Sequence, residues 1–248
     1  MPSEVRLIER ANALRRDLQR KVRQVGMLRA LGHGARKLAS RLVCRPSASQ
    51  IAERDPFDET YGTDTARIVS VGALDIEDSR LAHSNRYEAV MPEAFAEIMA
   101  SLQIVHREFV FIDIGSGKGR ALLLASRFAF AQIIGVELSA SLTAIAENNI
   151  RVFNDPQMKC RAIRAECADG GTYLPASVDT ILYLNNPFDQ QVMQPLVDTL
   201  QGWLAQSKRR LYVIYQRPLC RSLFDGSPAF ELMHSAQRFL IYRGRAAA

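Results

Sequence analysis

The segment from residue 109 to residue 120, Phe-Val-Phe-Ile-Asp-Ile-Gly-Ser-Gly-Lys-Gly-Arg, limits the fold of this chain more than any other segment. Five of its first six residues are apolar, which is typical of a parallel strand covered on both faces. Asp113 lies at the carboxyl end of this strand, and residues 121–126 have high helix propensity. Between them, glycines allow a sharp turn and the close approach of a ligand to the backbone: Gly115, Gly117 and Gly119. This order predicts a nucleotide pocket at the carboxyl ends of the strands of an α/β sheet.

The spacing of the glycines separates three kinds of nucleotide loop. A dinucleotide fingerprint, G-x-G-x-x-G, needs its third glycine at the position of Arg120. A P-loop needs a glycine at the position of Ile112 and a Ser or Thr at that of Gly119. The pattern that fits is Asp-x-Gly-x-Gly-x-Gly, which resembles the first motif of class I S-adenosylmethionine (SAM) methyltransferases. The resemblance implies that Asp113, Ser116 and the glycines hold the methionine end of SAM; a simple tight turn is the alternative.

A second strand is predicted over Gln132–Glu137, followed by a helix that continues to Ile150. Glu137 follows Gly117 by twenty residues, where nucleotide folds place the carboxylate that accepts the ribose hydroxyls. The resemblance therefore implies that Glu137 and Leu138 bind SAM. A solvated acid at a strand end is the alternative interpretation.

A third strand is predicted near residues 160–165 and ends in Glu166 and Cys167. In SAM methyltransferases this strand end supplies the acid or amide that faces the adenine amino group. The resemblance implies this role for Glu166, with Cys167 beside it. Asp169, three residues further on, is the competing candidate.

The fourth predicted strand, residues 178–184, ends in the sequence Asn-Asn-Pro-Phe. It resembles the fourth motif of amino-directed methyltransferases, in which an amide and a backbone carbonyl hold the N–H groups of the target nitrogen. The resemblance implies that Asn185, Asn186 and Phe188 are catalytic and that Asn185 also contacts SAM. This chain has one proline and an additional Asn, which is closer to the seven-strand histone-lysine methyltransferases that lack a SET domain. A loop of turn-forming residues with a core Phe is the alternative.

The rest of the chain completes an alternating pattern of strands and helices. A helix is predicted over residues 190–205 and a fifth strand over 209–215, and two short strands follow over 229–234 and 238–242. We therefore predict an α/β fold with a doubly wound, Rossmann-like sheet of seven strands, mostly parallel with a C-terminal antiparallel hairpin. This topology also resembles that of the class I methyltransferases.

Basic residues are concentrated at the amino terminus. Residues 1–45 contain twelve Lys and Arg and three acids, a net charge of +9, although the whole chain carries +6. Apolar residues recur there at steps of three and four, which predicts a basic amphipathic helix. Such a helix either covers the domain or binds nucleic acid, an anionic membrane surface or an acidic protein. The absence of aromatic residues from this segment disfavours single-stranded nucleic acid.

Three segments are predicted: a helical extension over 1–45, a cap over 46–108 and the SAM-binding core over 109–248. The cap contains a stretch of turn chemistry over residues 57–65 and a predicted helix over 93–102. The chain also resembles the lysine methyltransferases that modify ATP-synthase subunits. In these and in the non-SET histone methyltransferases, a Tyr/Gly/Thr or Tyr/Pro segment at this place folds over the methionine end of SAM. The resemblance implies lid or cofactor contacts for a small set of residues: Tyr61, Thr63, Asp64 and Tyr87.

Composition excludes several classes of protein. No apolar run approaches the roughly 20 residues that span a membrane, and the basic start lacks the features of a secretory signal. The cysteines are scattered without a C-x-x-C pair (Cys44, Cys160, Cys167 and Cys220). We expect neither a metal site nor a disulfide framework, and a reducing cytoplasm fits best.

The predicted function is transfer of a methyl group from SAM to an amino nitrogen, with a protein lysine favoured by the resemblance. A small-molecule amine and a nucleic-acid base are alternative acceptors. A lysine must first lose a proton, because an ammonium group has no lone pair. The contrasting hypothesis is a non-catalytic SAM-fold module that binds a partner through its basic N-terminal helices.

Overall fold

A computed structural model describes residues 55–67 and 88–245. The chain divides into two compact units, Met1–Ala52 and Glu53–Ala248, and every described residue belongs to the second. The basic segment 1–45 and Tyr87 lie outside the described residues. The predictions made for them, and the three predicted segment boundaries, therefore stay predictions.

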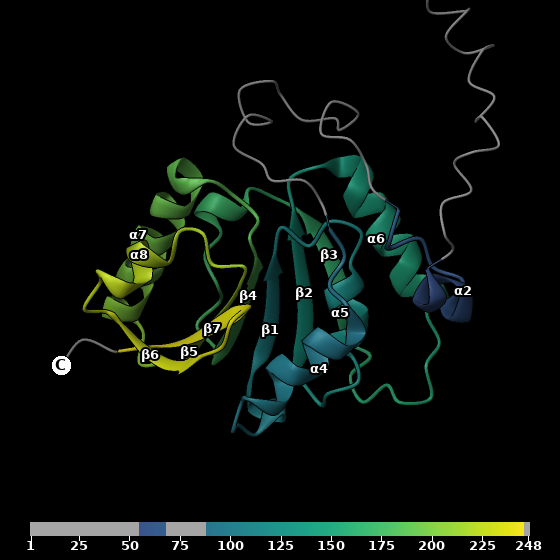
Figure 1. Ribbon diagram of the computed structural model, residues 1–248, viewed down its shortest axis with the longest axis horizontal. Helices are drawn as coiled ribbons and strands as arrows, with labels where there is room; N and C mark the ends of the chain where they lie inside the picture. Colours follow the sequence, from purple (N-terminus) through teal and green to yellow (C-terminus); the bar gives the residue numbers. More distant parts are fainter. Residues whose placement is uncertain (1–54, 68–87, 246–248) are drawn as a thin grey trace, which may run out of the picture. The chain divides into compact units, whose positions relative to one another are not determined.

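One mixed sheet with the strand order β3-β2-β1-β4-β5-β7-β6 forms the centre of the second unit (Figure 1). Strands β1 to β5 pair in parallel, whereas β7 is antiparallel to both β5 and β6. The strands are β1 Val110–Ile114, β2 Gln132–Glu137, β3 Ile163–Cys167, β4 Thr180–Asn185, β5 Leu211–Gln216, β6 Phe230–Ser235 and β7 Phe239–Gly244. The predicted seven-stranded sheet with a C-terminal antiparallel hairpin is confirmed.

Helices cover both faces of the sheet, because successive residues of each buried strand point to opposite sides. Phe111 of β1 belongs to a core shared with α4 and α5, whereas the next residue, Ile112, belongs to a second core shared with α7 and α8. The helices are α2 Pro56–Tyr61, α4 Pro92–Ala100, α5 Arg120–Ala125, α6 Ala140–Val152, α7 Gln190–Gln206 and α8 Arg221–Asp225, with short 3-10 helices η2 His106–Glu108 and η3 Gly170–Thr172. Two separate apolar layers therefore hold the strand ends in place.

The third strand differs most from its predicted bounds. It begins at Ile163 rather than at Cys160, because the backbone N–H of Cys160 donates to the carbonyl of Ser126 instead of joining the ladder. Pairing with β2 starts at Ile133 opposite Ile163 and continues to the end of both strands. Glu166 and Cys167 are therefore the last two residues of β3 itself.

Helix α2 was expected as a turn and is a short helix. Asp55 is its N-cap and accepts hydrogen bonds from the backbone N–H groups of Phe57 and Asp58. Pro56 occupies the first turn, and Gly62 ends the helix in a left-handed conformation with φ of 67°. The capping signals were present in the sequence, but six residues are too few to show an apolar period. Helix α8, with five residues, was missed for the same reason.

Candidate active site

The glycine loop connects β1 to α5 and lies at the carboxyl edge of the sheet. The backbone N–H groups of Gly115 and Ser116 donate to the carbonyl of Val136 in β2, at 2.8 and 3.1 Å. Gly115, Gly117 and Gly119 have φ values of 77°, 52° and 85°. Side chains other than glycine rarely adopt this region, so the loop conformation requires these three glycines.

Close packing joins the glycine loop to its neighbours. A Cβ atom at Gly115 would lie 2.7 Å from Cβ of Pro187, so the loop lies directly against the Asn-Asn-Pro-Phe segment. A Cβ atom at Gly135 of β2 would lie 2.7 Å from Oγ of Ser116. That Oγ atom is buried and has no hydrogen-bond partner among the described residues. It is therefore a candidate to bind a ligand that enters the loop.

Glu137 ends β2 and contacts the same loop. Its Oε2 accepts a hydrogen bond from the N–H of Gly117 at 2.8 Å, and its Oε1 accepts from the N–H of Ser139 at 2.9 Å. The side chain is buried, with 8% of its surface exposed. The structure therefore brings together Gly117 and Glu137, which the sequence analysis combined on spacing alone.

Asp113 supplies a second carboxyl group at this edge. It is almost fully buried, and burial together with the charge of Glu137 raises its pKa from 3.8 to about 8. A buried carboxyl group next to another carboxylate is stabilised in its charged form by a cation or by hydrogen-bond donors. The pair therefore suits a ligand that carries an ammonium group near the loop.

The end of β3 lies beside Glu137. Cys167 is opposite Glu137 in the strand register, and its thiol donates to the carbonyl of Leu138 at 3.6 Å. Cys167 and Leu138 are thus next to the predicted ribose carboxylate.

The two candidates for the adenine contact have different surroundings. Glu166 accepts hydrogen bonds from Arg164 Nε at 2.6 Å and from the Tyr173 hydroxyl at 3.2 Å, so both of its oxygens have protein partners. Asp169 caps η3, accepting from the N–H of Gly171 at 2.9 Å. Asp169 follows the strand end, where the other cofactor candidates lie.

The predicted catalytic residues follow β4. The amide nitrogen Nδ2 of Asn185 donates to the carbonyl of Glu88 at 3.1 Å. Its Oδ1 atom is buried without a hydrogen-bond partner among the described residues. Asn186 adopts a left-handed conformation with φ of 46°, which Asn tolerates better than most residues. The ring of Phe188 packs on η3, since a Cβ atom at Gly170 would lie 3.0 Å from its Cζ.

Two residues that the sequence analysis did not single out lie close to Asn185. Arg217, directly after β5, forms a bidentate ion pair with Glu88 at 2.6 and 2.5 Å. Glu88 therefore bridges the ends of β4 and β5, since its carbonyl binds Asn185 and its carboxylate binds Arg217. No local pattern links residue 88 to residue 217, so only the folded chain shows this contact.

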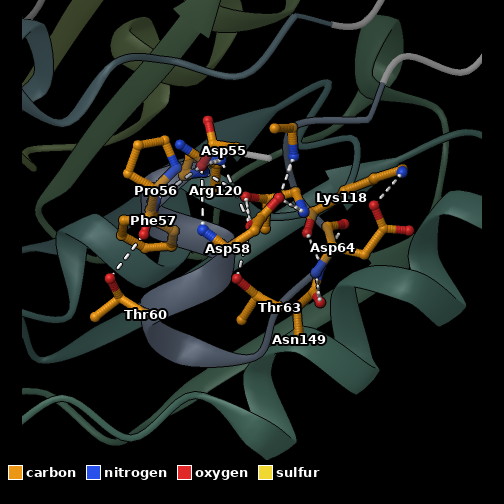
Figure 2. Close-up of polar contacts among 12 residues, drawn as sticks. Asp55, Pro56, Phe57, Asp58, Thr60, Thr63, Asp64, Lys118, Arg120 and Asn149 are labelled. Carbon is orange, nitrogen blue, oxygen red and sulfur yellow. Dashed lines mark hydrogen bonds and ion pairs between the residues drawn. The ribbon is translucent and has the colours of Figure 1, made fainter. Parts of the chain in front are cut away.

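The lid candidates Tyr61 and Thr63 contact other protein groups. The Tyr61 hydroxyl donates to Asp155 Oδ2 at 3.2 Å and accepts from Arg127 at 2.9 Å. The Thr63 hydroxyl donates to Asp58 Oδ1 at 2.7 Å (Figure 2). Their predicted contacts with SAM stay predictions.

Fold and site together define a class I, SAM-dependent methyltransferase. The loop of three glycines and the two buried carboxyl groups fit the methionine end and the ribose of SAM, as does the Oγ of Ser116, which has no partner within the described part of the chain. The chain belongs to the DOT1 family: residues 66–225 match the family described as histone methylation protein DOT1. No curated protein matches the chain.

Solved structures similar to this chain include three methyltransferases with low sequence identity. An RNA methyltransferase of Salinibacter ruber, in complex with S-adenosyl-L-homocysteine, is 17% identical over 63% of this chain and 92% of its own, with a TM-score of 0.44. Magnesium protoporphyrin IX methyltransferase of Synechocystis, with bound SAM, is 14% identical over 62% and 77%, with a TM-score of 0.45. A dimethyladenosine transferase of Plasmodium falciparum is 10% identical over 64% and 62%, with a TM-score of 0.46. The family membership rests on the match over residues 66–225.

Within the described residues, no helix is long and apolar enough to cross a membrane. The same part of the chain holds no cluster of three or more His, Cys, Asp or Glu side chains that is arranged to bind a metal ion.

Proposed function

We propose that this methyltransferase transfers the methyl group of SAM to an amino nitrogen, and that the acceptor is a lysine of a protein. The observation that carries the proposal is the orientation of the Asn185 amide. Because Nδ2 donates to the carbonyl of Glu88, the amide cannot flip without placing two oxygens together, and Oδ1 is fixed as the free atom. A buried hydrogen-bond acceptor at this place selects a substrate that presents an N–H group.

When bound, SAM supplies a methyl group on a positively charged sulfur, and the transfer is an in-line displacement. We assign Asp113, Ser116 and the glycine loop to the methionine end and Glu137 to the ribose. Asp169 is our candidate for the adenine amino group. Leu138 and Cys167 flank the same edge, and the oxygens of Asn185 and the ring of Phe188 orient the acceptor nitrogen. Asn186 presents its backbone to the acceptor from a left-handed conformation.

The net charge of residues 46–248 and the description of the DOT1 family both favour a lysine over the other acceptors. Residues 46–248 carry a net charge of −3, so the body of the protein does not repel a basic segment. The DOT1 family is described by histone methylation. The lysine ammonium must release a proton before transfer, and desolvation at the half-buried Asn185–Phe188 segment lowers the lysine pKa.

Incubation with SAM labelled in its methyl group tests the proposal. The probes are core histones, the same histones after acetylation of every lysine, transfer RNA and spermidine. We expect label only in the unmodified histones, and no label with Asn185→Ala, which should bind S-adenosylhomocysteine (SAH) within about threefold of the wild type. Gln194→Ala, an exposed change on α7, is the matched control and should leave labelling unchanged. Label in RNA or spermidine, or equal label in the acetylated histones, would contradict a lysine acceptor.

A further inference from the structure

Asn149 is a fully buried polar residue on α6, with 0% of its surface exposed. Its Nδ2 donates to two carbonyls, those of Lys118 at 2.9 Å and Asp64 at 3.0 Å, and its Oδ1 accepts from the N–H of Asp64 at 2.9 Å. One side chain therefore binds both backbone groups of residue 64 and a carbonyl of the glycine loop. Removing it would leave one buried and two partly buried backbone groups without this partner, which is unfavourable.

The segment that Asn149 binds is the turn from Thr63 to Ala66, which we call the docking turn. Asp58 organises it: Oδ1 accepts from the hydroxyls of Thr63 and Thr65, and Oδ2 accepts from the N–H groups of Thr65 and Ala66, at 2.6–2.8 Å. Burial alone would raise the pKa of Asp58, but these hydrogen bonds outweigh it and the pKa is lowered. The docking turn is thus a preformed unit that presents residue 64 to α6.

Two buried cations join the glycine loop to the same segment (Figure 2). Lys118, between the second and third glycines, is 1% exposed and pairs with Asp64 at 2.9 Å. Arg120, the first residue of α5, is 2% exposed and donates to Asp55 at 2.7 Å and to the hydroxyl of Thr65. Its guanidinium also lies 4.4 Å from the centre of the Phe57 ring.

These contacts make the loop and the docking turn depend on each other. If the turn moved away, Lys118 would lose its carboxylate partner Asp64 and Arg120 would lose the hydroxyl of Thr65. A buried cation without a partner is strongly unfavourable. The loop is also held by Glu137 at the end of β2, which accepts a hydrogen bond from the N–H of Gly117. The loop shape that receives the cofactor is therefore fixed from β2 and from α6.

We propose that Asn149 is a positioning residue for SAM, and that it couples docking of residues 63–66 to cofactor binding. It acts through the carbonyl of Lys118, and we assign it no contact with the cofactor. The inference rests on the proposed cofactor site in the glycine loop. It gives the 55–66 segment a function different from that of a lid: it supports the glycine loop from the side of α5 and α6.

Calorimetric titration of the full chain with SAH tests the coupling. Asn149→Ala should weaken SAH binding tenfold or more in a sample that is folded by circular dichroism. Asp58→Asn weakens the hydrogen bonds that organise the docking turn and removes the ion pair with Arg120 at 3.5 Å, and should weaken binding severalfold. Thr60→Ala removes an exposed hydroxyl that bonds within α2, and should leave the affinity unchanged. If Asn149→Ala does not fold, the SAH affinity of Asp58→Asn alone tests whether the docking turn is coupled to cofactor binding.

Hydrogen exchange separates positioning from a merely structural role. SAH should slow exchange of the amides of Asp64, Thr65 and Ala66 severalfold in the wild type, and should not do so in Asn149→Ala. SAH affinities within twofold of the wild type in both folded variants, or exchange at residues 64–66 that SAH does not change, would overturn the inference. Absence of SAH binding to the wild type would instead overturn the proposed cofactor site itself.

Discussion

The Glu137 carboxylate accepts a hydrogen bond from the backbone N–H of Gly117 at 2.8 Å, across a sequence separation of twenty residues. Its other oxygen accepts from the N–H of Ser139, at the start of α6. One side chain therefore fixes the middle of the glycine loop and the beginning of the following helix. In the proposed function, the same carboxylate also accepts the ribose hydroxyls. Loop shape and cofactor recognition thus depend on a single residue.

Asp113 should make SAH binding depend on pH. Its pKa of about 8 means that it is protonated at neutral pH in the free protein, because of burial and the nearby Glu137. An ammonium ligand favours the charged carboxylate, so binding releases a proton. We expect the SAH affinity to increase by up to about tenfold between pH 6 and pH 7, and to become independent of pH above pH 8. Calorimetry in buffers with different ionisation enthalpies measures the proton release.

Asp113→Asn provides the control and a second prediction, on stability. A carboxyl group whose pKa is about 8 when folded and 3.8 when unfolded stabilises the fold most below pH 4, and this contribution falls as the pH rises to 8. The amide that replaces the carboxyl group cannot ionise, so the variant should lose less stability than the wild type between pH 5 and 8 while binding SAH more weakly. Identical urea midpoints for the two proteins across this range would contradict the pKa assignment.

Gly115→Ala should reduce both stability and SAH affinity. A Cβ atom there would lie 2.7 Å from Cβ of Pro187, and φ is 77°. Gly62→Ala is a matched control, because φ is 67° but nothing lies within 4 Å of the added atom. Both variants should lose about 1 kcal/mol through the positive φ, and Gly115→Ala should lose roughly 1–3 kcal/mol more through the clash.

Urea unfolding and SAH titration of both glycine variants measure these effects. Equal stability losses in the two variants, or weaker SAH binding in Gly62→Ala than in Gly115→Ala, would contradict the prediction. The contact between the glycine loop and Pro187 would then contribute little to stability or to SAH binding.

His106 should destabilise the fold in acid. Burial, and then the charge of Lys159, lowers its pKa below 6.5. Its Nε2 is buried without a hydrogen-bond partner among the described residues, and the ring lies 5.2 and 5.0 Å from those of Phe128 and Phe130. Because the folded state resists protonation, the stability that His106 contributes is complete above pH 6.5 and is lost as the pH falls below it.

Melting temperatures of the wild type and His106→Phe at pH 5 and pH 7.5 test this. The melting temperature of the variant relative to that of the wild type should be higher at pH 5 than at pH 7.5, since a phenylalanine cannot take up a proton among these rings. A difference between the two proteins that is the same at both pH values would exclude the histidine as the cause.

The sequence predicted the parts of the site whose signals are local. The bounds of β2 were predicted without error, because an apolar run is closed by Gln132 and Glu137. The glycine loop was identified from spacing, and the structure shows the contact between Gly117 and Glu137.

Contacts between distant segments were not predictable from one sequence. Asn149 has the appearance of a polar residue on an amphipathic helix, yet it is buried against residues 64 and 118. Nothing in the local sequence marks Lys118 or Arg120 as buried, although both are buried ion-pair partners. Glu88 bridges Asn185 and Arg217 across two strand ends, a relationship that depends on strand order.

Titration of the purified full chain with SAH, beside Glu137→Ala and an NAD control, tests the central claim most directly. We predict micromolar binding of SAH, no measurable binding of NAD, and a loss of tenfold or more in the variant, about 1.4 kcal/mol per decade. Absence of SAH binding to the folded wild type, or equal affinity in Glu137→Ala, would contradict a cofactor site built on the glycine loop and Glu137.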